Sequence, residues 1–114
     1  MGIEIITLTT DEVIERMPVE GNRQPMLAVH GGANAVLVED AASRLALLVA
    51  PERRAAVGTE LTVSHVRAAT SGWVTARAIP TYVGRSSMIS TVELRDDDGE
   101  LTALGKLTCV FTKL

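Results

Sequence analysis

HGGANAVLVEDAASRLALLVA, residues 30–50, is the stretch of sequence that decides the fold. Its segment 33–50 contains no Gly or Pro, is dominated by Ala and Leu, and has apolar residues around nearly the whole helical circumference. The segment therefore predicts a single helix that is buried on most sides and ended by Pro51. One carboxylate, Glu39, lies well inside this helix, at a position where packing alone favours an apolar residue.

Short strands are predicted on both sides of this helix, because β-branched or alternating apolar segments there end at turn residues. Two strands, one long helix and four further strands fit an α+β fold, in which an antiparallel sheet wraps around one central helix. One Trp, one Tyr and one Phe predict an aliphatic core. The predicted strands cover residues 3–9, 13–19, 57–67, 73–83, 88–96 and 101–111.

The composition limits the classes of function. A chain of 114 residues is expected to form one domain, residues 1–114. The net charge is −3 and the Lys and Arg residues are scattered, which argues against nucleic acid as a partner. We expect a soluble, cytoplasmic protein without a membrane partner, because no apolar run reaches the length of a membrane span and no signal-peptide pattern opens the chain.

The sequence predicts no metal site. Cys109 is the sole cysteine, so the chain cannot form an internal disulfide or a thiolate cluster, and we interpret this residue as a small buried side chain of a strand. The acidic run 96–98 before Gly99 lacks the ligand spacing and the closing Glu of a calcium loop, which favours a hairpin tip.

The residues around the start of the helix are suited to polar chemistry. Gln24 and His30 precede the apolar run, and Gly31 and Gly32 begin it. The first N–H groups of a helix have no partners within it and lie at its positive dipole end, so they can bind a developing negative charge. Two adjacent glycines let the carbonyl group of a ligand approach the backbone closely.

Seven motifs, in this order along the chain, resemble the hotdog-fold acyl-CoA thioesterases. The likeness is to the PaaI-like branch that contains dihydroxynaphthoyl-CoA thioesterase of menaquinone synthesis and its enterobactin-pathway proofreading relative. Gln24 lies six residues before His30 and Glu39 nine residues after it, a spacing more specific than a lone His-Gly-Gly; at Asp40, relatives often carry Ser. The motifs are Met17-Pro18-Val19, Gln24-Pro25, Val29-His30-Gly31-Gly32-Ala33, Val36-Leu37-Val38-Glu39, Gly58-Thr59-Glu60-Leu61, His65-Val66-Arg67 and Val83-Gly84-Arg85.

This resemblance implies a thioester hydrolase with no cofactor besides the CoA of its substrate. Hydrolysis needs a polarised carbonyl, an activated water or a carboxylate nucleophile, and donors for the tetrahedral oxyanion. We expect the Gly32 N–H to bind the carbonyl oxygen and the Gln24 amide to hold the thioester or a water. His30 would orient Gln24 or donate a hydrogen bond. Glu39 would act as base or nucleophile, since both roles need the same ionised carboxylate.

The resemblance also assigns residues to substrate binding. His65-Val66-Arg67-Ala68 matches the CoA-contacting strand of the family, and a half-buried structural histidine is the alternative for His65. The segment Val83-Gly84-Arg85-Ser86-Ser87-Met88 would hold the CoA phosphates through Arg85, and a plain hairpin turn is the alternative. The remaining candidates are Gly31 and Gly58.

A cross-subunit site follows from the length of the helix. Gly32 and Glu39 lie seven residues apart, about 10 Å along one helix, so one carbonyl cannot meet both. We therefore expect a homodimer in which each chain supplies Glu39 to its partner's site, as in the family, and a homotetramer built from such dimers. Asp40 and Arg44, at positions i and i+4, are expected to form a surface ion pair instead.

Two alternatives to a free acyl-CoA substrate stay open. One is an acyl group borne by a carrier protein, and the other is a thioester-binding module without catalysis. Arg67 and Arg85 favour free CoA, because cations bind its phosphates. Glu39 together with Gln24 argues against a silent module.

Overall fold

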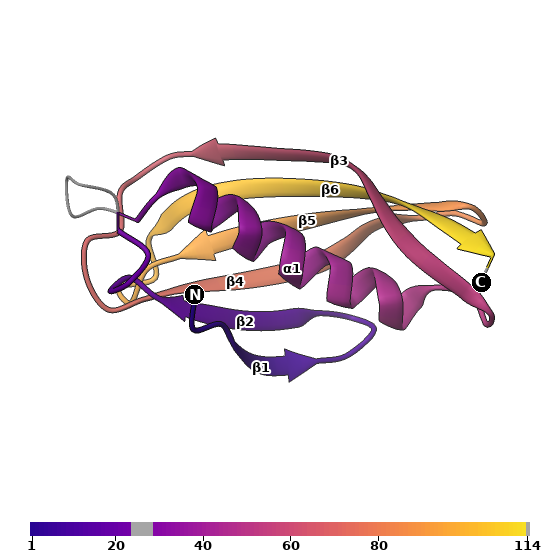
Figure 1. Cartoon of the computed structure of the whole chain (residues 1–114), viewed down its shortest axis with the longest axis horizontal. Helices are drawn as coiled ribbons and strands as arrows, with labels where there is room; N and C mark the ends of the chain where they lie inside the picture. Colours follow the sequence, from indigo (N-terminus) through magenta and orange to yellow (C-terminus); the bar gives the residue numbers. More distant parts are fainter. Residues whose placement is uncertain (24–28, 114) are drawn as a thin grey trace.

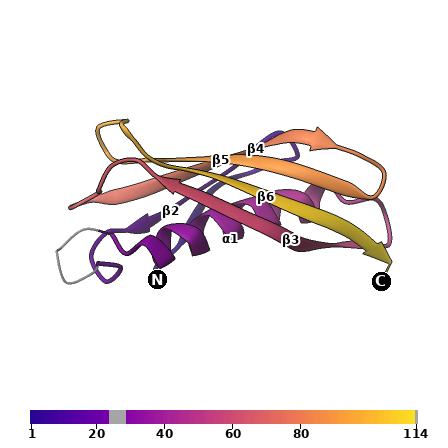
Figure 2. The same cartoon turned by 90° about the horizontal axis from the view of Figure 1, so that it is seen from above.

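A single helix packs against one face of a six-stranded antiparallel sheet in the computed structural model, which describes residues 1–23 and 29–113 (Figure 1). The order across the sheet is β1-β2-β4-β5-β6-β3, and the sheet curves around the helix (Figure 2). The predicted α+β hotdog architecture is therefore confirmed. The elements are β1 (Glu4–Leu8), β2 (Val13–Pro18), α1 (Gly31–Val49), β3 (Arg54–His65), β4 (Trp73–Val83), β5 (Ser87–Arg95) and β6 (Leu101–Lys113).

The predicted boundaries of the elements hold within a few residues. β4 spans 73–83 as predicted, and α1 begins at Gly31 rather than Ala33. The largest difference is at β3, which begins three residues before Val57. β3 pairs with β6 from Arg54 to His65, so pairing with a long neighbouring strand extends β3 beyond its β-branched part.

The core between α1 and the sheet is aliphatic, as predicted, and Phe111 is the one aromatic side chain among the buried residues of the described chain. Small residues such as Ala41 and Ala46 on α1 are fully buried and let the helix approach the sheet. At Gly105 of β6, an added Cβ would lie 2.5 Å from Val38 Cγ1. Glycine is therefore required where β6 passes beneath α1.

The helix is less completely buried than predicted. One face packs on the sheet, whereas Val36, Leu47 and Leu48 are between 41% and 59% exposed. Gly32 and Glu39 are exposed as well. Exposed apolar side chains on a helix can be covered by another chain.

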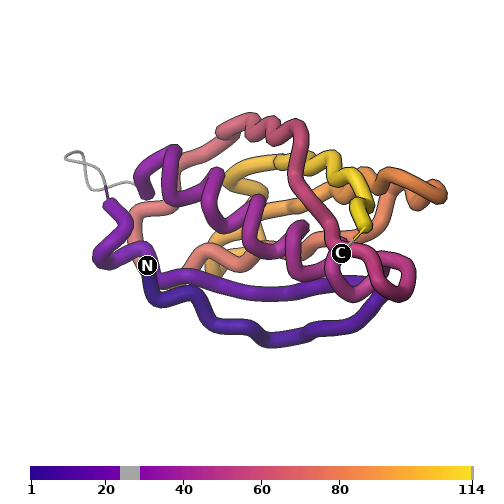
Figure 3. The backbone as a smooth tube through the Cα atoms, turned by 45° about the vertical axis from the view of Figure 1, so that its right-hand side comes forward, coloured from indigo at the N-terminus to yellow at the C-terminus, as the bar shows by residue number. Residues whose placement is uncertain are grey.

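The two ends of the elongated molecule, 43 Å along its longest axis, carry different loops (Figure 1). The start of α1, the segment 66–72 after β3 and the β5–β6 turn lie at one end. The end of α1, the start of β3 and the β4–β5 turn with Arg85 lie at the other. β1 and β3 form opposite edges of the sheet, on either side of α1 (Figure 3).

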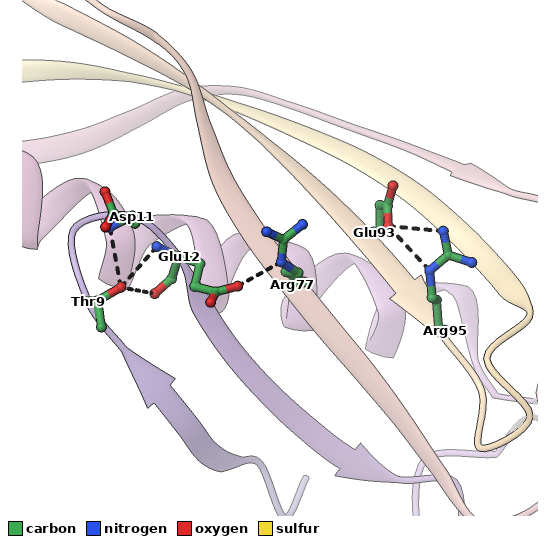
Figure 4. A network of polar contacts seen from close by, with 6 residues as sticks. All are labelled: Thr9, Asp11, Glu12, Arg77, Glu93 and Arg95. Carbon is green, nitrogen blue, oxygen red and sulfur yellow. Dashed lines mark hydrogen bonds and ion pairs between the residues drawn. The ribbon is translucent and has the colours of Figure 1, made fainter.

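The face of the sheet turned away from α1 carries a polar network (Figure 4). Glu12 Oε1 lies 2.7 Å from Arg77 Nε, and Glu93 Oε2 lies 3.0 Å from an Arg95 guanidinium nitrogen. The Thr9 hydroxyl accepts hydrogen bonds from the backbone N–H groups of Asp11 and Glu12. Exposed ion pairs contribute little to the free energy of folding, so these contacts indicate that this face of the sheet is hydrated.

Cys109 is a buried free cysteine, as predicted, and burial raises the pKa of its thiol. No helix in residues 1–23 and 29–113 is long and apolar enough to cross a membrane. In the same residues, no group of three or more His, Cys, Asp or Glu side chains is arranged to hold a metal ion.

Candidate active site

His30 caps the start of α1 with its own side chain. Its backbone is extended, and its Nδ1 accepts a hydrogen bond from the N–H of Gly32 at 2.9 Å. The N–H predicted to bind the carbonyl oxygen is therefore engaged by His30 in this structure. The neighbouring N–H of Gly31 meets no acceptor within the described residues. Among the described residues, Gly31 thus presents an unpaired donor at the positive end of the helix dipole.

A pocket of about 390 Å³ opens beside this helix start. It brings Gly31 together with the predicted substrate-binding segment His65-Val66-Arg67-Ala68, which lies far from it in the sequence. The ring of His65 covers Gly31 so closely that an added Cβ would lie 3.3 Å from its Nε2. The lining residues are Val29, Gly31, Asn34, His65, Val66, Arg67, Ala68 and Ala69.

Asn34 completes one wall of the pocket and was not among the residues predicted from the sequence. The side chain is 6% exposed, and its Nδ2 lies 3.3 Å from His65 Nδ1. Its one sequence signal is a polar amide inside an otherwise apolar run. Gln24, the other predicted amide of the site, lies outside the described residues.

Glu39 does not line the pocket of its own chain. It lies on the exposed face of α1, and its negative charge adds to burial in raising the pKa of Cys109 in β6. Cys109 pairs with Gly58 of the neighbouring strand β3. Gly58, like Glu39, is exposed. Glu39 and Gly58 therefore belong to the region near the middle of the outer strand, away from the helix start.

The second predicted binding segment lies at the opposite end of the molecule from the pocket (Figure 1). Val83, Arg85 and Ser86 are exposed, and Gly84 and Ser87 are partly buried. The N–H of Gly84 donates to the Ser87 carbonyl at 2.8 Å, which closes the β4–β5 turn. One chain therefore does not join Arg85 to His65.

The assignment of Met88 to substrate binding is wrong for its side chain. Met88 is 0% exposed and belongs to the hydrophobic core, on the same face of β5 as Val92 and Leu94. Alternation along a strand sends these side chains inward, so Met88 supports the turn from below without reaching a ligand.

Negative charge surrounds Arg67 at the mouth of the pocket. Arg67 lies 4.0 Å from Glu100 and lines a second hollow of about 220 Å³ together with Asp96, Asp97 and Asp98. These carboxylates offset the attraction that Arg67 alone would offer to phosphate groups.

The predicted ion pair between Asp40 and Arg44 is present, with Asp40 Oδ2 2.8 Å from Arg44 Nε. Sequence reasoning missed its third member, Glu15 of β2, whose Oε2 lies 3.5 Å from the same nitrogen. Glu15 is 0% exposed, and burial first, then the neighbouring Asp40, raises its pKa to about 8. Burial would also raise the pKa of Asp40, but its neighbours Glu15 and Arg44 lower it overall.

Comparison with known proteins agrees with this fold. A family model described as the thioesterase superfamily matches residues 28–103. A "Putative esterase" of Deinococcus radiodurans is 43% identical over 110 residues, 96% of this chain and 69% of the relative. The proofreading thioesterase EntH of Cronobacter turicensis is 33% identical over 109 residues, 95% of this chain and 80% of the relative. The crystal structure of thioesterase HI1161 from Haemophilus influenzae superposes with a TM-score of 0.94 at 32% identity, over 99% of this chain and 80% of that one.

The chain belongs to the thioesterase superfamily. Its hotdog fold and its relatives make it a thioester hydrolase, which confirms the resemblance read from its motifs.

Proposed function

We propose that this thioester hydrolase cleaves acyl-CoA, with an aryl or a short to medium-length acyl group, into free acid and CoA in the cytoplasm. The observation that carries the proposal is the pocket in which Gly31, at the start of α1, faces the segment 65–68. Helix-start N–H groups suit the carbonyl oxygen of a thioester. Residues Val66 to Ala68 are exposed along this pocket, where a pantetheine arm could lie against them.

In this proposal, the carbonyl oxygen of the substrate binds at the start of α1. The N–H of Gly31 donates to it, and the N–H of Gly32 joins when the His30 ring releases it. The oxygen gains negative charge as the tetrahedral intermediate forms, and the two donors and the helix dipole stabilise that charge.

Glu39 supplies the step that starts hydrolysis. As a base, its carboxylate takes a proton from a water whose oxygen bonds to the carbonyl carbon; the C–S bond then breaks, and the proton passes to the leaving thiolate. As a nucleophile, it bonds to the carbonyl carbon itself and releases the thiolate, and water then cleaves the resulting anhydride. In both routes Gln24 holds the thioester or the water.

The site is completed by a second copy of the chain. β3 is an edge strand that pairs on one side with β6, and its Val57 and Leu61 are 50% and 37% exposed. Antiparallel pairing of two β3 strands about a twofold axis would cover these side chains and the exposed face of α1. It would bring Glu39 and the Arg85 turn of one chain towards the pocket of the other, and two such dimers would form the expected homotetramer.

A carrier-protein thioester is the second candidate substrate, and the acidic hollow next to the pocket favours it. Asp96, Asp97 and Asp98 beside Arg67 would repel the phosphates of free CoA. A partner protein with basic residues around its pantetheine arm would be attracted instead.

The test is hydrolysis of a panel of aryl-, branched- and straight-chain acyl-CoAs, with the same acyl groups on a purified carrier protein, by the wild type and by Glu39→Gln. We expect turnover of at least one CoA ester, and a loss of about a hundredfold or more in kcat in the variant, because the amide can act neither as base nor as nucleophile. Turnover of the carrier-bound esters alone would favour the second candidate. Turnover that Glu39→Gln leaves unchanged would reject the assigned role of Glu39.

A further inference from the structure

Asn34 holds a buried hydrogen-bond acceptor that the protein leaves unused. Its side chain is 6% exposed, and its Oδ1 has no hydrogen-bond partner among the described residues. The other half of the amide is engaged, since Nδ2 lies 3.3 Å from His65 Nδ1. Buried polar atoms are normally paired, so an unpaired one that lines a pocket indicates a ligand that pairs it.

The side-chain amide of Asn34 faces the imidazole ring of His65 through its Nδ2. Nδ2 donates to His65 Nδ1 when the proton of the ring is on Nε2, and this leaves Oδ1 as an acceptor. The same imidazole ring packs over Gly31, within 3.3 Å of an added Cβ. Asn34 and Gly31 are neighbours at i and i+3 on the helix face that borders the pocket. The N–H of Gly31 and the Oδ1 of Asn34, both unpaired among the described residues, therefore belong to two residues of one wall.

We propose that Asn34 is a substrate-binding residue whose Oδ1 accepts a hydrogen bond from an N–H or O–H group close to the thioester carbonyl. The inference rests on the proposed function, because it takes the carbonyl to bind at the N–H of Gly31. A donor about 5 Å from that carbonyl, one helical turn along the wall, meets the requirement. Two parts of a substrate can supply it: the first amide of the pantetheine arm, two carbons from the sulfur, or a hydroxyl group on the acyl chain.

Two pairs of substrates distinguish these sources. In the first pair, the benzoyl thioester of N-acetylcysteamine is compared with its isostere in which an ester oxygen replaces the amide N–H. In the second pair, 2-hydroxybenzoyl and benzoyl thioesters share one thiol. We expect Asn34→Ala to lower kcat/KM about tenfold for the member that donates, and less than about twofold for the member that does not. The pair in which this difference occurs identifies the donor.

Asn34→Leu repeats the test with a side chain close in size to Asn. If Asn34→Ala disturbs the fold by leaving a cavity, the Leu variant still tests the loss of the hydrogen-bond acceptor. Asn22→Ala is the matched control: Asn22 is 7% exposed and lies outside the pocket, and its Nδ2 is already bonded to the carbonyls of Met1 and Pro18. Its loss should lower the unfolding temperature and change both members of each pair equally.

Binding gives a measurement that does not depend on turnover. The phenacyl thioether of N-acetylcysteamine keeps a carbonyl and the N–H but cannot be hydrolysed, and its ester isostere and a 2-hydroxyphenacyl analogue complete the set. Titration calorimetry should show that Asn34→Leu weakens binding of the donating ligand alone. Equal changes for every pair, in turnover and in binding, would overturn the role of Asn34 while leaving the hydrolase intact. Absence of any acyl-CoA or carrier turnover by the wild type would instead reject the proposed function.

Discussion

The carboxylate of Glu15 on β2 lies 3.5 Å from the guanidinium of Arg44 on α1, with no exposed surface of its own. Arg44 also bonds Asp40 at 2.8 Å, so two carboxyl groups share one cation across the helix–sheet interface. Burial of the Glu15 carboxyl is the main reason why its pKa rises to about 8, and the neighbouring Asp40 adds to this rise, while Arg44 opposes it. Near neutral pH, Glu15 therefore keeps its proton, whereas Asp40, whose pKa is lowered, is ionised.

This pair predicts that stability falls as the pH rises. The pKa of Glu15 is raised from its ordinary value of 4.5 to about 8, so between these values the folded chain keeps a proton that the unfolded chain has released. The contribution of Glu15 to the free energy of unfolding is therefore full below 4.5 and decreases by about 1.4 kcal/mol per pH unit up to the folded pKa. Glu15→Gln removes this dependence. Urea unfolding of both proteins from pH 5 to 9 should show the variant more stable than the wild type at pH 8.

Glu12→Gln is the control for this experiment, because Glu12 is a partly exposed carboxylate paired with Arg77 on the other face of the sheet. It should leave the pH dependence of unfolding unchanged. Parallel curves for the wild type and Glu15→Gln would mean that Glu15 is ionised in the folded chain.

Gly105→Ala should destabilise the fold without touching the site. The added methyl group would lie 2.5 Å from Val38 Cγ1, so helix and strand must separate, at a cost of about 1–3 kcal/mol. Val38→Ala removes the two Cγ atoms that obstruct the added methyl group. The loss of stability caused by Val38→Ala alone should therefore largely disappear when this substitution is combined with Gly105→Ala. Urea unfolding of the four proteins measures this coupling. If the losses in the free energy of unfolding are additive, the contact between residues 38 and 105 does not limit how closely α1 packs on β6.

Local sequence patterns were sufficient for most of the fold. The alternation along β4, β5 and β6 and the unbroken apolar run of α1 act over a few residues, and those elements were predicted with small errors. The early start of β3 was not predictable in the same way. Arg54, Ala55 and Ala56 have weak strand preference, and they are extended because Lys113, Thr112 and Phe111 pair with them.

The residues of the site also differ in whether local sequence patterns could predict them. The motifs located Gly31 and the His65 segment, and the structure joins them in one pocket. Asn34 and Glu15 are buried against elements that are distant in the sequence. Motif spacing along the chain therefore could not predict their contacts. Met88 is the opposite case. It borders the Val83-Gly84-Arg85 motif, but its side chain lies in the core on the same face of β5 as Ser90 and Val92.

Arg85→Ala tests whether the turn at the far end of one chain serves the pocket of another. If Arg85 meets the phosphates of CoA, the variant should raise KM for CoA esters about tenfold and leave KM for an N-acetylcysteamine thioester unchanged, because that substrate has no nucleotide. Arg77→Ala, on the outer face of the sheet, is the matched removal of a cation. A loss of equal size on both substrates would assign Arg85 a structural role in the β4–β5 turn.

The last prediction concerns Glu39, which does not line the pocket formed at the start of its own helix. Glu39→Ala and Gln24→Ala should each be inactive alone. When equal amounts of the two are unfolded and refolded together, random pairing makes about half of the dimers mixed. Each mixed dimer has one site with Gln24 from one chain and Glu39 from the other, and one site that lacks both. Activity should therefore return to about a quarter of the wild-type value. Native mass spectrometry of the refolded mixture establishes that mixed dimers are present. If they are, and activity stays at the level of the two parents, then both residues serve a site within a single chain and the shared site is rejected.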